Sequence, residues 1–526
     1  MNSHRIYTFR GGVLAGAALL LFSFPGRAQQ TPPSTPPDAT SIRQLEDQIR
    51  ELRTLVEAMR VENAQSRAEM GRLREDLQAT RLLLETPAAA GAAAAATTAA
   101  PAQTGASTQA GSQASTALEQ RVEKLEESTS LIGSKVDEQH ETNVETASKY
   151  RARLHGIVLM NAFRNTGYSD SFDLPSYAEP VPRGWPVASV GATLRQSEIG
   201  IEIFGPKVAG ARTSADVQLD FAGGFPDTGN GVNFGLARLQ TASLRLDWQH
   251  TSLVAGQDAL FLSPLSPTSF ASLALPAFAF AGNLWAWTPQ LRVEHRFSVS
   301  DQQTITLQAG VFDNLNWEFP NNQFNRTPQA GELSGQPAYG LRTAWSRAGH
   351  DHSLSFGAAG YYGRQNWTWG RYVDAWAGMA DWEIPLAPRL ELSGEFYRGV
   401  GIGGLGAAVG TSIVYGGNPR FPFTPIRGVD AAGGWAQLKF RLTPKLELNG
   451  AVSDDDAFTA NIRGFATDAY NFGLIIGRNQ GALANVVFRP RSDLVLAGEF
   501  RRLRTFPVYS SSSMTNVAGV SAGILF

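Results

Sequence analysis

Charged side chains recur at every second position through the C-terminal part of the sequence, where they alternate with large apolar side chains. In one such stretch, Glu198 and Glu202 alternate with Ile199, Ile201 and Ile203. Successive side chains of a β-strand point to opposite faces, so each stretch predicts a strand with one charged and one apolar face. Charged groups that face water attract or repel ions and orient dipolar solutes, and this is the chemistry that these residues could perform.

The alternation places both signs of charge on one predicted face of successive strands. That face carries Arg151, Arg153, Glu198, Glu202, Asp216, Asp220, Arg245, Asp247, Arg292, Glu294, Arg296, Arg342, Glu391, Glu395, Lys439 and Arg441. The same parity adds Asp381, Glu383, Glu447, Arg489, Glu499 and Arg501. If the face lines a water-filled lumen, we expect these residues to be pore-lining and to tune which solutes pass. The alternative for each residue is a structural ion pair against the wall.

The connection Phe261–Ala286 is unusually apolar for a segment between two strands. A loop of this composition would not remain exposed to water, so it must fold into the interior or pack at a subunit interface. We predict that it folds inward and acts as a constriction loop. The candidates for its polar rim are Ser263, Ser266, Thr268, Ser269 and Asn283.

Other kinds of chemistry find little support in the sequence. It has no cysteine, which excludes a disulfide scaffold, a cysteine-ligated zinc site and a cysteine nucleophile. No spacing of Ser, His and Asp indicates a catalytic triad, and the glycine-rich run 401–404 lacks the strand and helix of a phosphate-binding loop. The run 454–456 consists of three Asp and could bind a cation, but a solvated loop explains it better. We therefore predict no catalytic residue, no metal and no cofactor, and we do not expect an enzyme.

The connections between the predicted strands alternate between short and long. The short ones lie near Lys207 and at 249–251, 299–302, 348–351, 385–388, 443–445 and 490–493. The long ones are 164–191, 222–235, 261–286, 314–337, 364–370, 400–430, 454–478 and 505–515. The stretch 470–476 alternates weakly, and we place it within the seventh long connection. This pattern predicts an all-β transmembrane barrel of about sixteen antiparallel strands over residues 150–526.

The stretch Asn516–Phe526 shows the strand pattern most clearly. Val520, Ala522, Ile524 and Phe526 fall on one face, and small or polar residues fall on the other. Taken alone, this stretch would also fit an edge strand of a soluble sandwich. The preceding strands, however, oppose an unbroken apolar set to densely charged faces, and only a barrel with lipid outside and water inside uses both.

The first part of the sequence follows different patterns. Residues 1–28 combine a basic start, a short apolar run and small residues before Ala28, as a signal peptide does, and the run is too short for a membrane anchor. Residues 38–86 keep apolar residues at heptad positions, which predicts an N-terminal α-helical coiled coil without settling how many helices it joins. An Ala/Thr/Gln/Ser-rich linker at 87–115 and a short second coiled-coil helix at 116–147 are expected to follow.

The order of these segments resembles that of the DcaP-like trimeric outer-membrane porins, relatives of the phosphate-selective porin superfamily. The likeness includes the signal peptide, the coiled coil, the linker, the strand at 149–163, the Gly-Gln-Asp run at 256–258 and the final Phe526. A final aromatic of this kind is similar to the signal that the barrel-assembly machinery reads. The resemblance implies a sixteen-stranded homotrimer with a periplasmic coiled coil that takes up small, often anionic, organic solutes.

The leading hypothesis is therefore a porin of the bacterial outer membrane, a water-filled channel for passive transport of small hydrophilic solutes, anionic ones among them. Its expected partners are outer-membrane lipid, further copies of the chain and the solutes. A balance of 45 Lys+Arg against 47 Asp+Glu disfavours nucleic acid. The alternative is a structural envelope tether, in which the coiled coil contacts the cell wall and the pore is incidental. An outer-membrane enzyme ranks third.

Overall fold

The structure, a computed structural model, describes residues 151–225, 235–316, 326–349, 353–465, 471 and 475–526. The chain divides into two compact units, Met1–Arg121 and Val122–Phe526, and all described residues belong to the second. The predicted signal peptide, coiled coil, linker and second helix lie outside the described residues.

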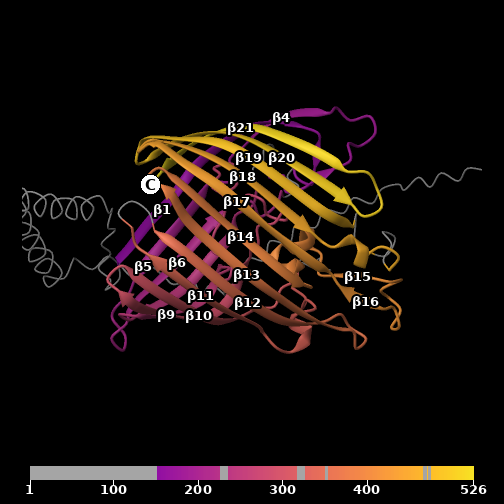
Figure 1. Cartoon of the computed structure of the whole chain (residues 1–526), viewed down its shortest axis with the longest axis horizontal. Helices are drawn as coiled ribbons and strands as arrows, with labels where there is room; N and C mark the ends of the chain where they lie inside the picture. The colour runs from indigo at the N-terminus through magenta and orange to yellow at the C-terminus, as the bar shows by residue number, and fades with distance from the viewer. Residues whose placement is uncertain (1–150, 226–234, 317–325, 350–352, 466–470, 472–474) are drawn as a thin grey trace, which may run out of the picture. The chain divides into compact units, whose positions relative to one another are not determined.

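The described strands wind into one closed antiparallel barrel with 16 crossings (Figure 1). Its strands are β1 (Arg151–Thr166), β4 (Ala188–Thr193), β5 (Glu198–Phe204), β6 (Arg212–Asp220), β7 (Arg238–Asp247), β8 (Thr251–Ala259), β9 (Trp287–Ser300), β10 (Gln303–Phe312), β11 (Ala338–Arg347), β12 (Leu354–Asn366), β13 (Tyr372–Ala387), β14 (Leu390–Val400), β17 (Asp430–Thr443), β18 (Leu446–Asp456), β19 (Ile476–Arg491), β20 (Leu494–Pro507) and β21 (Ser513–Leu525). Both β4 and β5 pair with β1, one after the other, so together they make one crossing. Pairing of β1 with β21 closes the sheet, and the predicted barrel is confirmed.

Short and long connections alternate around the barrel, as predicted. Figure 1 shows the C-terminus at one end of the strands and the small sheet of β15 and β16 at the other. We call these the short-turn end and the long-loop end. The long connections contain the remaining elements, β2 (Tyr168–Ser169), β3 (Ala178–Glu179), β15 (Ile413–Tyr415), β16 (Ile426–Gly428) and the 3-10 helices η1 (Glu332–Ser334), η2 (Gly403–Leu405), η3 (Ala407–Gly410) and η4 (Thr459–Asn461). Most of the stretch 470–476 lies outside the described residues, and its last residue, Ile476, begins β19.

One crossing differs from the prediction. The segment β4 begins at Ala188, within the connection predicted at 164–191, so that boundary was wrong. Its alternating residues are small, and they give little of the apolar signal that marks the other strands. The crossing is interrupted between Leu194 and Ser197, where the Ser197 N–H donates to the Leu194 carbonyl at 3.0 Å instead of to the ladder.

The two faces of the sheet differ in exposure in the way that the alternation predicts. On β1, Leu154, Val158 and Met160 are 55%, 58% and 51% exposed, whereas Ile157 and Leu159 on the opposite face are 5% and 0% exposed. A continuous set of exposed large apolar residues indicates a surface that contacts lipid or another chain. No helix in the described part of the chain is long and apolar enough to cross a membrane, a finding that does not bear on strands.

Candidate functional site

The connection between β8 and β9, residues 260–286, runs through the inside of the barrel, and we call it the inner loop. Strands β8 and β9 are neighbours, yet side chains of β14, β17, β19 and β20 bond to the inner loop from far around the closed sheet. A segment outside the barrel would have to pass around several strands to make these contacts. The sheet face that the inner loop contacts is therefore the inner face. The inward folding follows from the apolar composition of the loop, and a constricting role stays a prediction.

The first half of the inner loop is fastened to β14 and β17. The Ser263 hydroxyl and the Leu265 N–H both donate to the Glu395 carboxylate, the second at 2.8 Å. The Thr268 N–H donates to Gln437 Oε1 at 2.7 Å. Glu395 is 5% exposed and Gln437 is 1% exposed. Because a buried carboxylate is stable only when it is hydrogen-bonded, these contacts hold the loop against this part of the wall.

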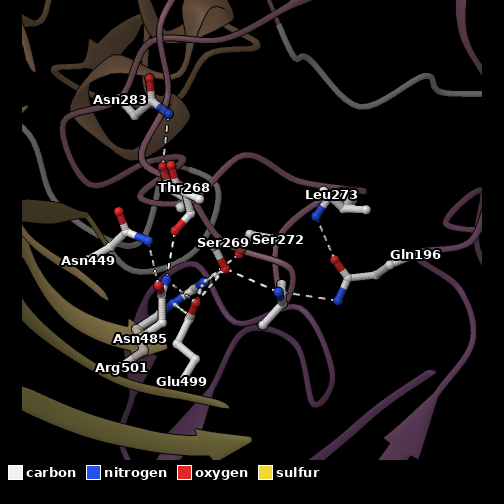
Figure 2. Close-up of polar contacts among 12 residues, drawn as sticks. Gln196, Thr268, Ser269, Ser272, Leu273, Asn283, Asn449, Asn485, Glu499 and Arg501 are labelled. Carbon is white, nitrogen blue, oxygen red and sulfur yellow. Dashed lines mark hydrogen bonds and ion pairs between the residues drawn. The ribbon is translucent and has the colours of Figure 1, made fainter. Parts of the chain in front are cut away.

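A second set of contacts, drawn in Figure 2, fastens the middle of the inner loop to β19 and β20. The Ser269 hydroxyl donates to Glu499 Oε2 at 2.6 Å, and the Arg501 guanidinium donates to the Ser269 and Ser272 hydroxyls. Asn485 donates to a loop carbonyl at 2.7 Å. Arg501 and Glu499 form an ion pair whose side chains are 7% and 6% exposed. This pair is part of the wall beneath the loop rather than of a surface open to solutes.

The interruption between β4 and β5 provides a third anchor. Gln196, which lies in the interruption, is fully buried. Its amide group donates to the Ala271 carbonyl at 3.1 Å and accepts from the Leu273 N–H at 2.8 Å, as Figure 2 shows for Leu273. A side-chain amide offers both a donor and an acceptor, so one residue satisfies two backbone groups of the loop. The break in the strand thus turns a side chain toward the loop.

Apolar contacts and glycines seat the second half of the inner loop. Phe278 is buried in a cluster with Trp435 on β17. A Cβ on Gly481 of β19 would stand 2.5 Å from the Phe278 ring, so the ring occupies the space that the missing side chain leaves. Gly282 has φ +109, and a Cβ there would stand 2.4 Å from the Gly434 carbonyl oxygen. Only glycine fits this position without strain.

Most of the predicted rim residues bond to the barrel wall or to other residues of the inner loop. Ser263, Thr268 and Ser269 are turned toward the wall by the contacts described above. Asn283 is fully buried and donates to the Ser266 hydroxyl at 3.1 Å, so its placement at a rim is contradicted. Ser266 is exposed. Composition identified the loop, but it could not tell which of its polar groups point toward the wall.

The predicted charged residues lie in ion pairs along the inner face. The pairs are Arg153–Glu202 (3.4 Å), His155–Asp216 (3.1 Å), Arg238–Asp220 (3.1 Å), Arg245–Asp247 (2.9 Å), Arg292–Asp258 (2.8 Å), Arg296–Glu294 (2.6 Å), Arg342–Asp381 (2.8 Å), Lys439–Glu391 (3.7 Å), Arg441–Glu391 (3.7 Å) and Arg489–Glu447 (3.9 Å). Glu198 accepts a hydrogen bond from Gln240 at 3.3 Å, and Arg151 is exposed at the start of β1. The ion-pair alternative therefore describes the geometry of most of the set, and contact with solutes stays a prediction.

Within these pairs the basic partner is often the more exposed one. Arg153 is 46% exposed against 28% for Glu202, and Arg296 is 33% exposed against 13% for Glu294. The same order holds for Arg245 over Asp247, Arg441 over Glu391 and Arg489 over Glu447. An arginine extends its charged group on a long aliphatic stem, whereas a carboxylate stays close to the backbone. In these pairs the charge that projects farthest from the inner wall is therefore positive.

The run of three Asp at 454–456 does not form a solvated loop. It ends β18, where Asp455 is 1% exposed and accepts hydrogen bonds from the Tyr397 hydroxyl at 2.6 Å and the Ala408 N–H at 3.1 Å. Asp454 pairs with Arg478 at 2.7 Å. These carboxylates are used within the protein, and the described residues contain no group of three His, Asp or Glu that could hold a metal ion.

A buried carboxylate also organises the connection that contains β2 and β3. Asp170 accepts hydrogen bonds from the N–H groups of Ser176 and Tyr177 at 2.9 and 3.0 Å. Burial raises the pKa of Asp170 above its usual range, although these hydrogen bonds act in the opposite direction. Burial and the Asp170 charge together raise the pKa of Tyr177 to about 12. Hydrogen bonds to the buried Asp170 carboxylate therefore hold this connection in its fold at the long-loop end.

Three residues that anchor the inner loop were missed by the sequence reasoning, namely Gln196, Gln437 and Asn485. All three are neutral, and the charged pattern did not include them. The period of two does place Gln437 on the same face as Lys439, so the parity was readable in the sequence, but its partner in the loop was not. Gln196 lies in an interruption that has no periodic signal.

Neither a protein-family model nor a curated protein sequence matches this chain. Among solved structures, the outer membrane channel DcaP of Acinetobacter baumannii is similar over 73% of this chain and 99% of that chain, with a TM-score of 0.54 and 14% identity. The anion-selective porin from Comamonas acidovorans covers 72% of this chain and 100% of its own, with a TM-score of 0.42 and 12% identity. OprB of Pseudomonas putida is similar over 71% of this chain and 94% of that chain, with a TM-score of 0.44 and 12% identity.

At 14% identity the likeness to DcaP is one of fold. This chain has the closed antiparallel barrel of that outer membrane channel, which confirms the resemblance in fold expected from the order of its segments.

Proposed function

We propose that this protein is a porin of the outer membrane, through which small hydrophilic solutes diffuse passively. The observation that supports the proposal most is the inner loop, which is fastened inside a closed barrel whose inner face carries partly exposed charges. A barrel of this strand number is wide enough to leave an aqueous passage beside such a loop. Charged side chains along the passage would then act on the solutes that enter it.

The outward face supports the placement in a membrane. Besides the exposed residues of β1, it carries aromatic side chains such as Trp345 and Phe356, which stack near the short-turn end with ring centroids 6.4 Å apart. Aromatic residues at this position are typical of the interface between lipid and water. The partners that we propose are outer-membrane lipid and further copies of the chain in a homotrimer. We also propose that the short-turn end, and the coiled coil predicted before β1, face the periplasm.

We further propose a preference for anionic solutes. The greater exposure of the basic partner in several inner-face pairs supports it, because a solute in the passage would meet guanidinium groups before carboxylates. The similar porin from Comamonas acidovorans is anion-selective, but a likeness with a TM-score of 0.42 gives no support to the preference here.

Two measurements on the purified protein test the proposal. Proteoliposomes should swell in isotonic solutions of small sugars and of small organic acids, and liposomes without protein should not. The reversal potential in a gradient of KCl should have the sign of chloride permeation. Absence of swelling with every small solute would contradict the porin proposal, whereas a reversal potential with the sign of potassium permeation would contradict only the anion preference.

A further inference from the structure

Three exposed arginines stand on the outward face where the first and last strands of the barrel meet. Arg164 lies on β1, and Arg502 and Arg504 lie on β20. Strand β21 runs between them, with Ala518 opposite Arg164 and Asn516 opposite Arg502. Because neighbouring strands are about 4.8 Å apart, β1 and β20 are separated here by roughly 10 Å, within reach of long side chains from both sides. We call these three residues the arginine patch.

The arginine patch differs from the other outward-facing arginines near the long-loop end. Three such arginines on barrel strands each have a carboxylate partner on a neighbouring strand. The pairs are Arg364–Asp374 (3.7 Å), Arg398–Asp430 (2.7 Å) and Arg478–Asp454 (2.7 Å). Their charges are therefore balanced within the wall of the barrel.

No ion pair forms on the arginine patch among the described residues. The Arg502 Nε donates to Asn516 Oδ1 at 2.8 Å, and the Arg504 guanidinium lies 4.7 Å from the centre of the Phe506 ring. Strands β1 and β21 contain no acidic residue, and Glu499, the only one on β20, is on the inner face against Ser269. The patch thus presents three positive charges outward without a carboxylate between them.

Arginine on the lipid-facing surface of a barrel is costly in the hydrocarbon and is tolerated near the interface, where anionic headgroups lie. A guanidinium cannot lose its charge in a protein, and it binds phosphate oxygens through two parallel hydrogen bonds. The level of the patch along the strands is close to the long-loop end, because Arg164 is two residues from the end of β1. The patch would therefore meet headgroups of the leaflet on that side.

We propose that the arginine patch binds the phosphate groups of a phosphorylated lipid in the leaflet at the long-loop end. This inference rests on the membrane placement given under the proposed function. A second copy of the chain fits the patch less well, because the strands beside it offer no outward carboxylate. The acidic residues of β4 to β8 are Glu198, Glu202, Asp216, Asp220, Asp247 and Asp258, and all of them lie on the inner face with the partners given above.

The experiment measures lipid retained by the purified full chain in detergent, using native mass spectrometry. Lipid A serves as the phosphorylated probe and phosphatidylcholine as the zwitterionic reference. The test variant combines R164Q, R502Q and R504Q. The matched control combines R347Q, R389Q and R491Q, which removes the same charge from exposed arginines near the short-turn end. A third variant carries Lys at the three patch positions and keeps the charge.

The natural chain and the control should retain lipid A in preference to phosphatidylcholine, and the test variant should lose at least about tenfold in apparent affinity for lipid A. The Lys variant should fall between them, because charge remains while the paired hydrogen bonds are lost. Unchanged binding of lipid A by the test variant would overturn the proposal. If the test variant no longer forms an oligomer but still retains lipid A, the proposal is also overturned. That result would assign the patch to contact with a second copy of the chain. Conductance of the same samples reports separately on the proposed function.

Discussion

Arginine side chains on the inner face reach farther from the wall than several of the carboxylates with which they pair, and this difference has a measurable consequence. Arg153, Arg245 and Arg296 are 46%, 34% and 33% exposed, and each is paired on the inner face. Replacing all three by Gln should lower the ratio of chloride to potassium permeability by roughly twofold or more, because three exposed positive charges are removed from the inner face. The reversal potential in a KCl gradient measures this ratio.

The control for this substitution is the R164Q/R502Q/R504Q variant, which removes the same charge from the outward face. It should leave the permeability ratio near that of the natural chain. An equal change in both variants would mean that net charge, rather than charge inside the barrel, sets the preference.

Gly282, in the second half of the inner loop, leads to a prediction about how firmly the loop is held against the barrel wall. Gly282→Ala should reduce the free energy that holds this half of the loop against the wall by about 1–3 kcal/mol. The new side chain meets the Gly434 carbonyl oxygen, and the backbone conformation is unfavourable for alanine. Limited proteolysis of the folded protein should then cut within the inner loop sooner. Gly450→Ala is the matched control, since a Cβ at that position on β18 would meet nothing within 4 Å. Equal rates of proteolysis of the two variants would contradict the prediction that Gly282 is needed to hold the loop against the wall.

At the residue scale, the sequence predicted which charged residues share a face, because the period of a strand is two and their charges make the pattern visible. It did not predict which of these residues the inner loop covers. Glu395 and Glu391 have the same parity on β14, yet Glu395 lies under the inner loop and Glu391 faces two basic side chains. The difference depends on where a loop from a distant part of the chain comes to rest.

At the scale of elements, turn chemistry and strand period predicted almost every crossing, and the exception is instructive. The interruption between β4 and β5 follows small residues that have no apolar alternation, so neither cue was present. The same interruption provides Gln196, an anchor of the inner loop. The loop's inward path was predictable because its apolar residues must avoid water, but its anchors required the three-dimensional register of strands far apart in sequence.

The pairing of β1 with β21 leads to a prediction about closure. Backbone groups of Phe526 and Gly156 exchange hydrogen bonds of 2.9 and 3.1 Å next to the ladder between these strands. Deleting Phe526 removes both bonds and the aromatic ring, so the variant should unfold at a lower urea concentration, by about 1–3 kcal/mol in free energy. Phe526→Leu retains the backbone bonds and should lose less. A deletion variant as stable as the natural chain would show that closure does not depend on this contact.

At the scale of the whole molecule, an apolar outward face, a charged inner face and a loop held inside a closed sheet occur together. Each can be explained separately as packing, and the proposed water-filled passage through a membrane would account for all three together. The heptad pattern predicted the coiled coil, on which the tether alternative depends, and residues 38–86 lie outside the described residues. The proposed function therefore rests on the barrel and on what its interior contains.

The most direct test of this account is single-channel recording with the purified, folded protein in a planar lipid bilayer. We predict discrete, reproducible conductance steps in KCl, and larger steps from a variant in which Glu395 and Glu499 are both replaced by Ala, because the inner loop is then released from two of its anchors. Folded protein that inserts into the bilayer and yet gives no conductance steps would contradict the porin proposal.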